Sequence, residues 1–171
     1  MSSETQFSIL KNPLYAIDDK VYSDYHIMMN EMETEVSKMH KMVNSMNGQR
    51  EQLENLLTTI PADEKYAAMK KTGDSLVKEM KQWDEDMVQR KSKSYDDVEN
   101  FPNKFTANYM FLINQTESDI PKVTQSSLDV RKDLDTQWSG LQTKANDLMN
   151  NRLPAYNKEL WNAGFGAIWK K

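Results

Sequence analysis

The chain has 171 residues, of which 28% are charged and 38% hydrophobic, with five glycines, five prolines and no cysteine. This balance favours long amphipathic helices in one domain, and the lack of cysteine excludes disulfides, thiolate metal sites and a cysteine nucleophile. The net charge of −4 arises from interspersed acidic and basic residues, which disfavours nucleic-acid binding, and no run approaches the roughly 18 apolar residues that membrane insertion requires.

The first 19 residues differ in pattern from the rest. A polar start without the features of an export signal is followed by a brief alternation at Phe7 and Ile9 and then by Asn12 and Pro13. Alternation is typical of a strand, and proline disfavours a helix at the residue before it. We expect residues 1–19 to be disordered, or to be an orphan strand from an upstream β-domain, and residues 20–171 to form the helical domain.

Apolar residues recur at steps of three and four from Tyr22 to Ile60. This spacing predicts a helix over residues 21–59 that is about 58 Å long and ends before Pro61. Arg50 interrupts the apolar row, and a polar residue there can set register, although an arginine whose stem packs while its head reaches water is the plainer interpretation. The methionines of this helix are expected to fill the core, with an exposed peptide-binding stripe as the alternative: Met28, Met29, Met32, Met39, Met42 and Met46.

A second row of apolar residues runs from Tyr66 to Met87 after a short turn, which predicts an antiparallel neighbour. Residues 91–103 have the composition of a loop, and a short apolar helix is expected over 104–116. The last long helix should begin after Pro121, bend or break at Pro154, and end at Gly164. The predicted fold is all-α, an antiparallel bundle of three long helices plus one short helix, with more than about 70% of residues helical.

The sequence predicts no catalytic, cofactor-binding or metal-binding residues. His26 and His40 would lie about 21 Å apart on one helix, too far to share a metal ion. The acidic runs spread around their helices, and the basic cluster of Arg90, Lys91 and Lys93 lacks the regularly spaced aromatic residues of a nucleic-acid site.

Four large apolar side chains crowd the last eleven residues: Trp161, Phe165, Ile168 and Trp169. Because such a segment gains free energy when it leaves water, we expect the tail either to fold back at Gly164 or to dock on a partner. These four residues are the candidate interaction site.

Several stretches carry a family resemblance: residues 7–13, residues 48–53, Asn100-Phe101-Pro102, residues 134–138 and Ala163-Gly164. In this order they resemble the C-terminal helical region of bacterial secreted sortilin-like, Asp-box (BNR-repeat) β-propeller proteins, often labelled glycosyl hydrolases. The resemblance implies that the chain is an appendage of a propeller, that any hydrolase activity belongs to the propeller, and that the protein is periplasmic or extracellular.

The resulting interpretation is a non-enzymatic structural or interaction module whose partner is a neighbouring β-propeller domain or a second copy of the chain. One alternative is a self-associating coiled coil, expected if the first apolar row is longer than the second helix can cover. Another is a part of a glycoside hydrolase whose active site lies outside this chain. An active site within the chain would need two carboxylates about 5 to 10 Å apart in a cleft.

Overall fold

The computed structural model describes residues 4–10, 12–14, 17–94, 97, 99–118 and 122–169, so Lys11 and Pro121 lie outside the described residues. Helix accounts for 76% of the chain, and the described residues include no strand, which confirms the all-α class. The elements are α1 (Asp19–Thr59), α2 (Glu64–Met87), α3 (Phe105–Ser118), α4 (Gln125–Asp147), the π-helical turn η2 (Leu148–Arg152) and α5 (Leu153–Asn162).

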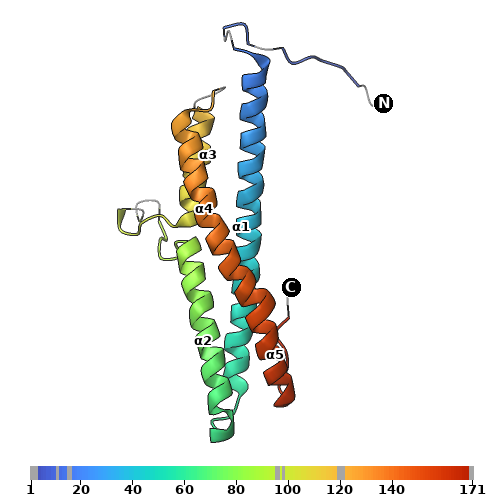
Figure 1. Ribbon diagram of the computed structural model, residues 1–171, viewed down its shortest axis with the longest axis vertical. Coiled ribbons are helices and arrows are strands. Elements are labelled where there is room, and N and C mark those ends of the chain that lie inside the picture. Colours follow the sequence, from blue (N-terminus) through green and yellow to red (C-terminus); the bar gives the residue numbers. More distant parts are fainter. Residues whose placement is uncertain are drawn as a thin grey trace.

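The bundle is an elongated rod (Figure 1). The helices α2 and α3 lie end to end along α1, while α4, η2 and α5 form a third, continuous helical path. The half of α1 that extends past α2 packs against α3, and Met28, Met29 and Met32 are buried there. The apolar row of α1 is therefore covered within the chain, which removes the observation that favoured a coiled coil between copies.

The helix starts follow from side-chain caps. Asp18 accepts a hydrogen bond from the backbone N–H of Lys20 at 2.8 Å, and Asp63 accepts one from Lys65 at 3.1 Å. Thr124 accepts one from Ser127 at 3.1 Å. A side-chain oxygen at this position satisfies an amide that the helix itself leaves unpaired, and so fixes where the helix begins.

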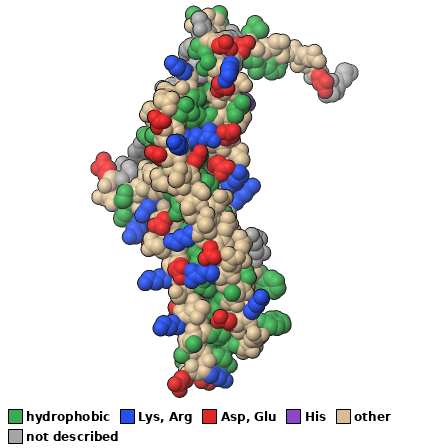
Figure 2. Space-filling view, viewed as in Figure 1, with side chains coloured by type: hydrophobic (Ala, Val, Ile, Leu, Met, Phe, Trp, Pro, Cys, Tyr) green, Lys and Arg blue, Asp and Glu red, His purple; other side chains and the backbone are tan. Residues whose placement is uncertain are grey.

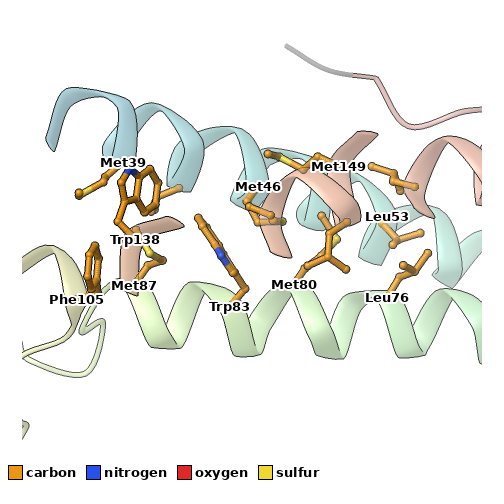
Figure 3. Packing of buried hydrophobic residues seen from close by; sticks show 14 of the residues in the cluster. Met39, Met46, Leu53, Leu76, Met80, Trp83, Met87, Phe105, Trp138 and Met149 are labelled. Atoms are coloured by element: carbon orange, nitrogen blue, oxygen red, sulfur yellow. The ribbon is translucent and has the colours of Figure 1, made fainter. Parts of the chain in front are cut away.

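The core is rich in methionine and tryptophan (Figure 3). Of the six methionines expected to fill the core from α1, five are buried and Met42 is half-buried, so the prediction of core filling is confirmed. Trp83 lies between α1 and the third helical path, and its Nε1 donates to the carbonyl of Leu141 at 2.8 Å. Phe105 stacks on Trp138 with ring centroids 6.1 Å apart. The flexible methionine side chains fill the gaps that these rigid rings leave.

Polar contacts join the three helices at the N-terminal end of the rod. Tyr109 of α3 donates to Asp135 of α4 at 2.7 Å, and Trp138 Nε1 donates to Glu35 of α1 at 3.0 Å. Arg131 of α4 donates to Glu31 of α1 at 2.8 Å. These directional contacts fix the register of α4 on α1, which apolar packing alone specifies less strictly.

The α-helix is interrupted just before Pro154 by the π-helical turn η2, but the path continues as helix through the proline. The backbone N–H of Leu153 bonds to the carbonyl of Leu148, five residues earlier, and the proline lies at the start of α5. Proline lacks an N–H and its ring clashes with the carbonyl four residues before it, so one widened turn removes the clash and lets the helix continue.

Candidate docking surface

The C-terminal segment reverses direction at the end of α5. Gly164 has a φ of +84°, in the left-handed region where glycine is favoured. Its N–H bonds to the carbonyl of Trp161 at 3.0 Å, and the N–H of Phe165 bonds to the carbonyl of Leu160 at 2.9 Å. This pair of bonds is a Schellman motif, which ends the helix and turns the chain back along it.

Two side-chain amides then hold the returning segment. Asn157 of α5 donates to the carbonyl of Ile168 at 2.9 Å and accepts from its N–H at 2.8 Å. Gln52 of α1 does the same with Trp169, and both of its hydrogen bonds are 3.1 Å long. Each side-chain amide both donates to and accepts from the backbone of one tail residue, so the tail is fixed between α1 and α5.

Apolar contacts add to these hydrogen bonds. Ile168 is buried at 6% exposure, and the ring of Phe165 meets Tyr66 edge-on with centroids 5.2 Å apart. Of the two alternatives that the sequence left open for the tail, the structure therefore shows the fold-back.

Trp161 and Trp169 nevertheless remain in water, at 73% and 72% exposure. Trp161 lies one helical turn after Asn157, and Asn157 holds Ile168, the residue before Trp169. Both residues therefore belong to the part of the rod where the C-terminal segment runs back along α5, and Figure 2 shows hydrophobic side chains projecting from the surface there. We call these two residues the tryptophan surface.

The candidate site thus divides into two pairs. Phe165 and Ile168 attach the tail to the bundle, while Trp161 and Trp169 face outward. The sequence pattern did not reveal Gln52 and Asn157, because a polar residue on a helix surface gives no sign of a partner that lies 117 residues away in the first case.

Arg50 lies beside the buried row of α1 rather than within it. Gln49 is the buried polar residue at this level, at 3% exposure. The half-buried Arg50 donates to Glu54 and to Asn47, both at 2.6 Å. An apolar row can pass from Met46 to Leu53 through position 49 or through position 50. Both routes combine one step of three residues with one of four, so the apolar spacing alone did not show which position is buried.

A surface hollow of about 410 Å³ lies where the segment after α2 meets the two long helices. Asp84 and Glu85 line it together with five basic residues: Arg50, Lys81, Arg90, Lys91 and Lys104. The buried Asp84 accepts hydrogen bonds from Arg90 at 2.5 and 2.6 Å, and this contact raises the pKa of Arg90. The pair ties the segment after α2 back to the end of that helix.

The two histidines are exposed on α1, and the Nδ2 of Asn30 lies 2.9 Å from Nε2 of His26. Within the part of the chain that the structure describes, no group of three or more histidine, aspartate or glutamate side chains could hold a metal ion. No described helix combines the length and apolar character that a membrane span requires.

Comparison of the chain with family models, with curated proteins and with solved structures finds no match.

Proposed function

We propose that this chain is a non-enzymatic helical interaction module that docks on a neighbouring domain through the tryptophan surface. One observation carries the proposal. Trp161 and Trp169 are about three-quarters exposed, although the segment that bears Trp169 is held by four hydrogen bonds with the side-chain amides of Gln52 and Asn157.

Exposed tryptophans on a fixed backbone suit binding for two physical reasons. Tryptophan is enriched among the residues that dominate interface free energies, because its ring buries a large apolar area and has few rotatable bonds. A backbone that is already ordered also loses less conformational entropy when a partner arrives. The fold-back thus prepares the surface before binding.

The resemblance suggests the class of the neighbouring domain. We propose a β-propeller of a secreted protein, which places the module in the periplasm or outside the cell and assigns any hydrolase activity to the propeller. The proposal is supported by the order of the resembling stretches along the chain.

The test begins with the reading frame that precedes this chain in its gene. The upstream domain is expressed separately, and its affinity for the helical chain is measured by titration calorimetry. We expect binding that Trp161→Ala/Trp169→Ala weakens by about 2 kcal/mol or more, roughly thirtyfold in affinity.

Phe111→Ala is the matched control, since Phe111 is 60% exposed on α3, away from the tail. It should bind as the parent chain does. Unchanged binding by the double tryptophan variant would contradict the docking proposal, and an upstream frame without a propeller would contradict the proposed partner.

A further inference from the structure

An extended arm leaves the opposite end of the rod. Residues 4–10 form no helix or strand, and three of their large apolar side chains stand almost fully in water: Phe7 at 82%, Ile9 at 91% and Leu10 at 85% exposure. Contact of three large apolar side chains with water is unfavourable in free energy, so the arm is expected to bind an apolar surface.

A groove of about 460 Å³ lies at the same end, between the first turns of α1 and the start of α4. Its apolar lining includes two residues that are themselves largely exposed, Ile27 at 52% and Leu128 at 43%. The remaining apolar lining residues are Val21, Met28 and Val123.

Charge is complementary between arm and groove. Of the charged groups that line the groove, Asp24 pairs with Lys20, and Glu31 pairs with Arg131. Lys122 has no ion-pair partner among the described residues. The described part of the arm carries one charge, the carboxylate of the exposed Glu4, which would meet Lys122 favourably.

The arm does not reach the groove of its own bundle. Figure 1 shows it leading away from α1 on the side opposite α3 and α4, whereas the groove opens between α1 and α4. A second copy has no such restriction. A two-fold arrangement would seat each arm in the other copy's groove, so that both copies make the same contacts.

We infer that two copies of this chain exchange their N-terminal arms, with Phe7, Ile9 and Leu10 of each copy packed in the α1–α4 groove of the other. The exchange is independent of the tryptophan surface, because Gln52, which holds Trp169, lies about 40 Å along α1 from the groove at a rise of about 1.5 Å per residue. The two proposals can therefore fail separately.

The absence of cysteine makes the exchange testable by disulfide trapping. A tagged Ile9→Cys chain is mixed with an untagged Leu128→Cys chain under mild oxidation, and the mixed dimer is identified by its mass. Docking of the arm holds the two thiols at a high effective concentration, so we expect about tenfold or more mixed disulfide than in the control pair Ile9→Cys with Thr143→Cys. Thr143 is exposed further along α4.

Light scattering supplies the second readout. The parent chain and the Trp161→Ala/Trp169→Ala variant should be dimers, whereas Phe7→Ser/Ile9→Ser should be a monomer with an unchanged helical circular dichroism spectrum. Mixed disulfide no greater than in the control, or a dimer that survives the arm substitutions, would overturn the exchange. A monomeric parent chain would also overturn it, and is the result expected if the arm instead pairs with a β-sheet of another domain. A disulfide formed within a single Ile9→Cys/Leu128→Cys chain would overturn it as well.

Discussion

At the scale of single residues, Gly73 decides how closely α2 approaches its neighbours. A Cβ at this position would lie 2.5 Å from Leu57 Cδ2 and 2.5 Å from the hydroxyl oxygen of Tyr156. That hydroxyl donates to the carbonyl of Met69 at 3.0 Å. The glycine thus permits a contact in which three helices meet, α1, α2 and α5.

Gly73→Ala should destabilise the bundle because Leu57 and the buried Tyr156 would both have to move. Its matched control is Gly140→Ala, a helical position with nothing within 4 Å of the added Cβ. Both variants gain helix propensity equally, so their difference isolates the clash, which we expect to be about 1–3 kcal/mol. Urea unfolding of the two variants measures it, and equal unfolding free energies would show that the site relaxes without cost.

Two buried tyrosines should make the bundle sensitive to alkali. Burial raises the pKa of Tyr156 from 10.0 to about 12, and burial together with the hydrogen bond to Asp135 raises the pKa of Tyr109 further. Unfolded tyrosines ionise near 10.0, so the unfolded chain loses protons first as pH rises. Stability should therefore be complete below pH 10 and fall between about pH 10 and 12, by up to about 1.4 kcal/mol per pH unit for each tyrosine.

Chemical unfolding at a series of pH values measures how steeply the unfolding free energy falls. Tyr156→Phe should remove the contribution of one ionising group from that slope. A tyrosinate absorbance titration of the folded protein gives an independent check. If all seven tyrosines ionised near pH 10 without unfolding, the burial of Tyr109 and Tyr156 would be contradicted.

At the scale of elements, the C-terminal segment contributes to stability as well as to the surface. Deleting residues 165–171 removes the buried Ile168 and the contact of Phe165 with Tyr66. We expect the unfolding free energy to fall by about 2 kcal/mol or more, given about 1.5–3 kcal/mol for each large apolar side chain buried.

The exposed Trp161 supplies the comparison for this deletion, since Trp161→Ala should change stability by no more than about 0.5 kcal/mol. Thermal denaturation of both variants measures the two changes in stability. A deleted chain that melts with the parent would mean that the fold-back contributes nothing to the bundle.

The helices themselves were predictable because local signals agree with the fold. The first helix was expected over residues 21–59 and is found at Asp19–Thr59, and the short helix was expected over 104–116 and is found at Phe105–Ser118. Apolar steps of three and four, the break at Pro61 and the glycine at 164 all act within a few residues. Such signals specify where a helix lies but not what covers it.

The contacts that build the tryptophan surface were not predictable in the same way. The bonds between Gln52 and Trp169 join residues 117 positions apart, and the proline alone did not distinguish a bend or a break from the widened turn that is found. The choice between fold-back and docking also had to be left open, because four apolar side chains favour burial without specifying the surface that buries them.

At the scale of the whole molecule, the rod separates two exposed apolar regions. The arm leaves one end, and the tryptophan surface lies towards the other. Between them, α1 extends without interruption over 41 residues, about 61 Å. Partners bound at the two proposed sites would therefore be held at a fixed separation by the rod.

The proposed function requires that the tryptophan surface be fixed before any partner binds. Hydrogen exchange at the amides of Ile168 and Trp169 tests it most directly, because these amides donate to Asn157 and Gln52. We predict exchange about tenfold or more slower than in an unstructured chain, equivalent to a local opening free energy of about 1.4 kcal/mol or more, with the protection at Trp169 lost in Gln52→Ala. Exchange of both amides at the unstructured rate in the parent chain would contradict a prepared docking surface.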